Sequence, residues 1–124
     1  MFELTINGEV YQFNFGMGFM RNINKRVGTP VDGLPDVKRN IGLRYYISGV
    51  IDGDIEDLEE VLLAANAGQS PRLTRDLLDA YIDREDTDID KLFGDVLDFL
   101  RSANATKKTL EAILDAVEKQ KNKN

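Results

Sequence analysis

Apolar and polar residues alternate at the start of the chain, in two runs on either side of Asn7-Gly8. This arrangement predicts a β-hairpin closed by a two-residue type I′ turn, because Asn and Gly tolerate the positive φ angles that the turn requires. One face of the hairpin is then apolar and carries Phe2, Leu4, Ile6, Tyr11, Phe13 and Phe15. The other face carries Glu3, Thr5, Val10, Gln12 and Asn14. Since a lone hairpin is only marginally stable in water, we expect the rest of the chain to cover the apolar face.

The segment after the hairpin gives a less uniform pattern. Apolar side chains at helical spacing predict a helix over residues 17–27. The segment 28–35 is rich in proline and glycine and predicts a loop. Residues 36–51 fit two interpretations, because some of their apolar residues alternate as in a strand and others follow helical spacing. The length of this segment favours a helix with a weak point at Gly42.

The second half of the chain predicts four amphipathic helices. Asp54 is placed to cap the first, and Ser70 followed by Pro71 predicts the start of the second. The third begins within residues 87–90, and the last spans about residues 106–119. In chain order, their apolar stripes are Ile55, Leu58, Val61, Leu62 and Ala65; Leu73, Leu77, Leu78, Tyr81 and Ile82; Ile89, Leu92, Phe93, Val96, Leu97 and Leu100; and Leu110, Ile113, Leu114 and Val117.

These elements predict an α+β fold that is predominantly helical, with an N-terminal β-hairpin followed by five to six short α-helices. A chain of 124 residues is long enough to bury a single hydrophobic core. Because residues 102–105 interrupt the helical pattern, we divide the chain in two. Residues 1–103 form one compact hairpin-plus-helices domain, and residues 104–124 form a C-terminal amphipathic helix with a polar tail.

The chain contains no cysteine and no histidine. This composition removes disulfides, thiol nucleophiles, and the commonest general base and metal ligand. The acidic residues 83–90 do not complete an EF-hand calcium loop, because a loop that begins at Asp86 has Lys91 in place of the required Gly and Leu97 in place of the required Glu. We therefore expect a protein without enzymatic activity, cofactor or metal ion.

The net charge of −6 is unevenly distributed along the chain. Residues 1–51 carry six basic and four acidic side chains, residues 52–103 carry five and fifteen, and residues 104–124 carry five and three. This distribution argues against nucleic acid as a partner, which requires a concentrated basic face. No segment approaches the roughly 20 apolar residues of a membrane span, and no signal peptide is visible before the first strand. We therefore expect a cytoplasmic protein that binds neither nucleic acid nor membrane.

The last helix is the candidate partner-binding element. Its apolar stripe either packs on the body of its own chain or presents an amphipathic face to a groove in another protein. On the second interpretation, the partner-binding residues are Leu110, Ile113, Leu114 and Val117. The adjacent Tyr45 and Tyr46 also allow two interpretations, and core packing is favoured over stacking on a ligand.

Three segments resemble a known protein family. They are the hairpin running into Phe13-Asn14-Phe15-Gly16-Met17-Gly18-Phe19-Met20, the segment Gly42-Leu43-Arg44-Tyr45-Tyr46-Ile47-Ser48-Gly49-Val50-Ile51-Asp52-Gly53-Asp54, and the pattern Leu-Phe-x-x-Val-Leu-x-Phe-Leu over residues 92–100. Over residues 2–103 the chain resembles the tail assembly chaperones of long-tailed phages and prophages of Gram-positive bacteria. The resemblance implies a non-enzymatic assembly factor that is absent from the mature virion.

The resemblance also implies partners. The main partner is the tape measure protein, a long helical polypeptide that such a chaperone keeps soluble while tail tube subunits assemble around it. The tail tube protein and further copies of the chain are additional partners. The resemblance supplies no polar site residues and does not include the helix after Asn104. The competing class is a small acidic adaptor or inhibitor that masks a host protein, and it would be recognised by co-purification with a host protein instead of a tail protein.

Overall fold

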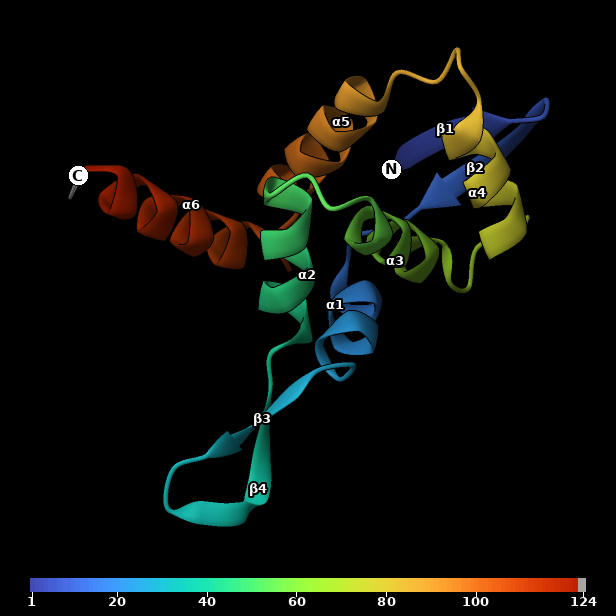
Figure 1. The fold of residues 1–124 in the computed structure, drawn as a ribbon. Coiled ribbons are helices and arrows are strands. Elements are labelled where there is room, and N and C mark those ends of the chain that lie inside the picture. Colours follow the sequence, from blue (N-terminus) through green and yellow to red (C-terminus); the bar gives the residue numbers. More distant parts are fainter. Residues whose placement is uncertain (123–124) are drawn as a thin grey trace.

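The computed structural model describes residues 1–122, which form two small antiparallel hairpins and six helices (Figure 1). The first hairpin consists of β1 (Phe2–Ile6) and β2 (Glu9–Phe13), and the second of β3 (Gly28–Val31) and β4 (Leu34–Asn40). The helices are α1 (Met17–Asn24), α2 (Gly42–Ile51), α3 (Ile55–Asn66), α4 (Arg75–Asp83), α5 (Ile89–Ser102) and α6 (Lys107–Asn122). The predicted fold class, α+β and predominantly helical, is confirmed.

The N-terminal hairpin has the predicted turn and register. Phe2 pairs with Phe13 and Ile6 pairs with Glu9. The turn residues have positive φ angles, 53° at Asn7 and 79° at Gly8. The side chains of the predicted apolar face are buried, apart from the half-buried Leu4. The register is unambiguous because a slip of one residue would turn the whole apolar face toward solvent.

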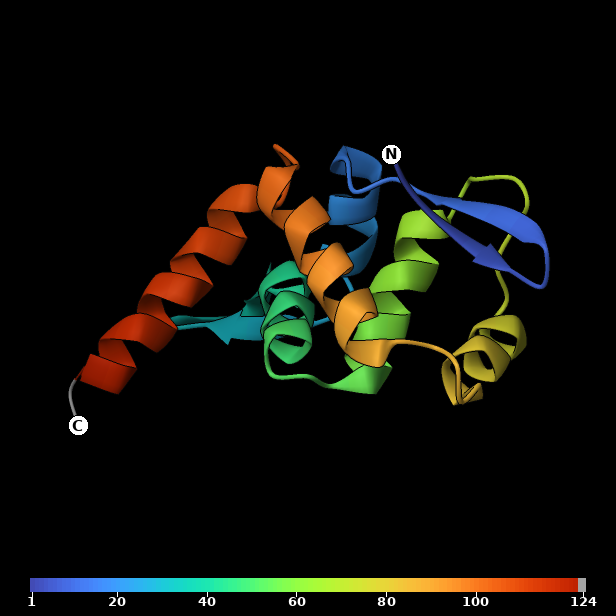
Figure 2. The same ribbon diagram turned by 90° about the horizontal axis from the view of Figure 1, so that it is seen from above.

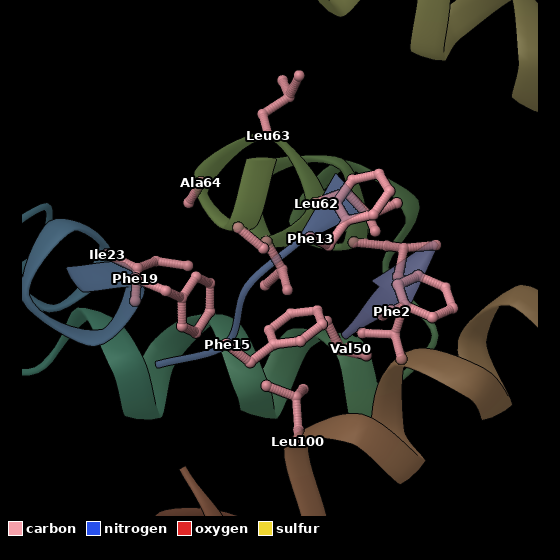
Figure 3. Close-up of a cluster of buried hydrophobic side chains, with 14 of the residues drawn as sticks. Phe2, Phe13, Phe15, Phe19, Ile23, Val50, Leu62, Leu63, Ala64 and Leu100 are labelled. Carbon is pink, nitrogen blue, oxygen red and sulfur yellow. The ribbon is translucent and has the colours of Figure 1, made fainter. Parts of the chain in front are cut away.

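One hydrophobic core joins this hairpin to the helices. Seen from above, α5 crosses over the body next to α2 and α3, and the first hairpin lies at one end (Figure 2). Aromatic rings fill the space between these elements: the ring centres of Phe2 and Phe99 are 5.0 Å apart, and those of Phe15 and Phe19 are 5.2 Å apart. Figure 3 shows the ring of Phe15 between Phe19 and Val50, with Leu100 of α5 pointing toward it. The hairpin is therefore covered as expected.

Asn66, at the end of α3, links three segments of the core. Its side chain is fully buried. The amide nitrogen donates hydrogen bonds to the carbonyl oxygens of Gln12 (3.0 Å) and Pro71 (3.3 Å). The amide oxygen accepts hydrogen bonds from the backbone of Leu73 (2.6 Å) and from the guanidinium of Arg72 (2.9 Å). The end of α3 is thus attached both to β2 and to the segment that leads to α4.

The predicted helix start at Ser70-Pro71 is wrong. Helix α4 begins at Arg75, and its N-cap is Thr74, whose hydroxyl oxygen accepts a hydrogen bond from the backbone of Leu77 (3.3 Å). The local signal is overridden because Asn66 binds backbone groups on both sides of residue 72 and holds this segment outside the helix. By contrast, Asp54 caps α3 as predicted.

The predictions for residues 17–51 need two further corrections. Helix α1 ends at Asn24, and the predicted loop and the first part of the predicted helix form the β3–β4 hairpin. Helix α2 begins only at Gly42, the predicted weak point. None of residues 28–40 is buried. No face of this hairpin packs on the core. Its sequence therefore lacks the regular alternation of apolar and polar residues by which a strand is recognised.

Gly42 permits the close approach of α1 and α2. A Cβ atom at this position would lie 1.9 Å from the carbonyl oxygen of Ile23 and 2.8 Å from that of Asn24. Because both are backbone atoms, the two helices would have to move apart. We expect Gly42→Ala to lower the free energy of unfolding by about 3 kcal/mol, as measured by urea denaturation.

The matched control is Gly94→Ala in the middle of α5, where a Cβ atom meets nothing within 4 Å. Alanine is the better helix former, so we expect this variant to gain about 0.5–1 kcal/mol. Equal stability changes in the two variants would contradict the assignment of Gly42 as a contact between helices.

Glu59 is a buried carboxyl group between α3 and α4, with only 7% of the residue exposed. It is hydrogen-bonded to the carboxyl group of Asp79, and its Oε1 lies 3.7 Å from the guanidinium of Arg75. Burial, followed by the hydrogen bond and charge of Asp79, raises the pKa of Glu59 from 4.5 to about 7, although Arg75 opposes the shift. Between these two values the folded protein binds more protons than the unfolded chain, so stability falls as pH rises through this window.

We expect Glu59→Gln to remove most of this fall, because glutamine keeps the hydrogen-bonding group without the charge. Above pH 7 the variant should be more stable than the wild type by about 1–3 kcal/mol. Urea denaturation at pH 5 and at pH 8 measures the difference. Glu56→Gln, an exposed position on the same helix, is the control and should follow the wild type. A fall of wild-type size in Glu59→Gln would show that another group causes it.

Candidate functional site: two apolar grooves

The structure places the four candidate partner-binding residues of α6 in different environments. Leu110 and Ile113 are buried in the core of their own chain. Leu114 is half-buried against the same core, whereas Val117 is 38% exposed. In this conformation, therefore, only the Leu114–Val117 end of the stripe is accessible to a partner, and the first turns of α6 pack on the body.

Thr106 determines how α6 leaves the body. The residue is buried, and its hydroxyl donates a hydrogen bond to the carbonyl oxygen of Leu100 (2.6 Å) at the end of α5. This bond ties the start of α6 to α5, and the rest of α6 then extends away from the other helices (Figure 1).

The exposed side of α6 forms one wall of a groove whose other wall is α2. We call it the α2–α6 groove; its volume is about 360 Å³. Its lining residues are Arg44 and Ser48 of α2, and Ile113, Ala116, Val117, Gln120 and Lys121 of α6. The apolar side chains come from one face of α6, and both charged residues of the lining are cations.

A second hollow lies where the start of β1, the connection from β2 to α1, and the end of α5 meet. We call it the N-terminal trough; its volume is about 450 Å³. Most of its lining is aromatic, aliphatic or methionine, and comprises Met1, Phe2, Phe13, Asn14, Phe15, Gly16, Met17, Phe99, Ser102, Ala103, Asn104 and Ala105. Met1 and Met17 are 65% and 47% exposed. Methionine side chains are flexible and polarisable, so a surface of this kind adapts to apolar partners of different shape.

Reasoning from the sequence missed the N-terminal trough as a site. The alternating pattern assigned Phe2 and Phe15 to the core, and that assignment is correct. The alternating pattern does not show that Phe99, which comes from the distant helix α5, lies beside these two residues at the surface. The one signal in the sequence is the family motif over Phe13 to Met20, which contains the exposed Met17.

The remaining candidate features have structural roles. Asp88 caps α5 by accepting a hydrogen bond from the backbone of Lys91 (3.0 Å), and Asp86 forms an ion pair with Arg84 (2.8 Å). Within residues 1–122, no group of three or more acidic side chains is placed to hold a metal ion. The favoured core packing of the two tyrosines is correct only for Tyr46, because Tyr45 is exposed.

In the part of the chain that the structure describes, no helix is both long and apolar enough to cross a bilayer.

Comparison with protein-family models gives a match over residues 3–115 to a family described as phage tail assembly chaperone protein, TAC. No curated protein and no solved structure matches the chain significantly. The matched segment contains the N-terminal trough apart from Met1 and Phe2. It ends before Ala116, so the outer part of the α2–α6 groove lies beyond it.

Two alanine substitutions test whether the α6 stripe is divided into a buried part and an exposed part. We expect Leu110→Ala to lower the free energy of unfolding by about 2–5 kcal/mol, because it leaves a cavity in the core. Val117→Ala should change it by less than about 0.5 kcal/mol, since that side chain is at the surface. Urea denaturation followed by circular dichroism measures both. Similar losses in the two variants would show that α6 packs along its whole length.

Proposed function

Since the chain belongs to the phage tail assembly chaperone family, we propose that it binds the tape measure protein and keeps that polypeptide soluble during assembly of the tail tube. The family assigns a role in tail assembly and phage tail proteins as partners. The specific client is our proposal. In this proposal the chaperone acts without catalysis in the cytoplasm of the host cell, and it is not retained in the mature virion.

We assign the client to the N-terminal trough. A long helical polypeptide exposes apolar stripes that aggregate unless they are covered. A helix of this kind docks its apolar face into a groove through side chains spaced three and four residues apart. The N-terminal trough offers aromatic walls with exposed methionines, which suits a client whose successive segments differ in sequence. The observation that carries the assignment is that this apolar hollow lies almost entirely within the family-matched residues.

The test is co-expression of the chain with the tape measure protein from the same gene cluster, followed by size-exclusion chromatography with light scattering. We expect a soluble complex that co-elutes, with the tape measure protein insoluble when it is expressed alone. A tape measure protein that is equally soluble without the chain, and no complex, would overturn the proposed function. Co-purification with a host protein would support the adaptor or inhibitor class instead.

Met17→Glu tests the assigned surface. The side chain is exposed at the first position of α1, where an acidic residue interacts favourably with the helix dipole, so the fold should be retained. We expect a charge in the N-terminal trough to reduce the recovered complex at least about tenfold, which corresponds to about 1.4 kcal/mol.

The matched control is Val10→Glu, an exposed apolar residue on β2 that does not line the trough. This variant should recover as much complex as the wild type. If Met17→Glu recovers as much complex as the wild type, the client binds another surface. The proposed chaperone function would still stand.

A further inference from the structure

The β3–β4 hairpin projects from the body next to α1 and α2 (Figure 1). All seven residues of β4 are exposed, and no residue of β3 is buried. A two-stranded hairpin without a packed face is marginally stable in water. A contact with another molecule would therefore stabilise this hairpin, because its own chain supplies no surface for it to pack on.

The far end of this hairpin combines apolar and acidic side chains. We call residues 31–37 the hairpin tip. Leu34 and Val37 are 53% and 46% exposed. Asp32 and Asp36 are exposed beside them, and they are the only charged residues of the tip. The strand register is irregular here, because Pro30 pairs with Lys38 whereas the next residue, Val31, pairs with Leu34.

The α2–α6 groove has the complementary composition. Ala116 and Val117 supply an exposed apolar surface next to the buried Ile113, and the charged side chains of the lining are Arg44 and Lys121. No acidic residue lines the groove. Among the ion pairs found within residues 1–122, none involves Arg44. A ligand for this groove should therefore present short apolar side chains next to carboxylates.

The hairpin tip meets this description, and the tip of the same molecule does not occupy the groove. The hairpin and α6 leave the body as separate projections in Figure 1, and the groove lies between α6 and α2. We propose that the hairpin tip of one molecule docks in the α2–α6 groove of a second copy. Leu34 and Val37 then cover the apolar surface, and Asp32 and Asp36 face Arg44 and Lys121.

This contact joins two different surfaces, so every molecule offers one tip and one groove. Such contacts close into a reciprocal dimer or a ring, or continue as an open chain. The N-terminal trough contributes no residue to either surface, so self-association leaves it free. The inference therefore does not depend on the proposed client. Because the opposite charges are exposed, association should weaken with salt, which screens them over about 8 Å at physiological ionic strength.

Two charge reversals test the contact. Asp36→Arg disables the tip and keeps the groove, whereas Arg44→Glu disables the groove and keeps the tip. We expect the wild type to exceed its monomer mass of 14.0 kDa with rising concentration in light scattering, and each variant to remain monomeric. An equimolar mixture of the two variants should associate again, because the intact tip of one fits the intact groove of the other.

Glu85→Arg is the control, since it makes the same charge change as Asp36→Arg at an exposed position in the connection between α4 and α5. It should associate as the wild type does, and circular dichroism should show that all three variants are folded. A wild type that is monomeric up to about 1 mM overturns the proposal. So does a mixture that stays monomeric, or association that persists in both single variants.

Discussion

The buried amide of Asn66 is the interaction on which the arrangement of the molecule depends. Its four hydrogen bonds reach β2 and the segment before α4, and an unsatisfied buried group of this kind costs about 1–3 kcal/mol. The bond to Gln12 holds the hairpin at the end of α3, where a second bond from the backbone of Asn14 to Ala65 (2.9 Å) supports it. The hairpin in turn places Phe2 against Phe99. The N-terminal trough therefore depends on a polar contact between Asn66 and Gln12, neither of which belongs to its lining.

The same aromatic cluster serves both stability and the candidate site. Phe2 and Phe15 are buried and hold β1 and α1 together, whereas Phe99 is only half-buried and reaches the surface. Two segments take no comparable part in this core: the β3–β4 hairpin and the outer half of α6. The hydrophobic core stabilises the body of the molecule, but it does not cover these two projecting segments. The exposed apolar residues of the projections are thus available for contacts with other molecules, which suits a family of assembly factors.

Several parts of the fold were predictable from the sequence because their signals are local. The Asn7-Gly8 turn has the side chains that positive φ requires, and the alternation of the flanking strands allows one register. Asp54 caps α3 through a bond to a residue three positions later. The family resemblance, which rests on local motifs, is confirmed by the match over residues 3–115. The β3–β4 hairpin was not predictable, because residues exposed on both faces have no period, and the start of α4 was missed because Asn66 acts on it from outside the segment.

By itself, then, the sequence determined the fold class, the first hairpin with its apolar face, the cap of α3, the start of α5, and the family. Only the tertiary structure decided which apolar residues are free for partners. Leu110 and Val117 belong to one stripe with one spacing, yet the first is enclosed by the core and the second is exposed. The physical reason is that periodicity records which residues share a face of a helix. How far along that face a neighbouring element extends depends on contacts between distant segments, such as the bond from Thr106 to Leu100 that directs α6 away from the body.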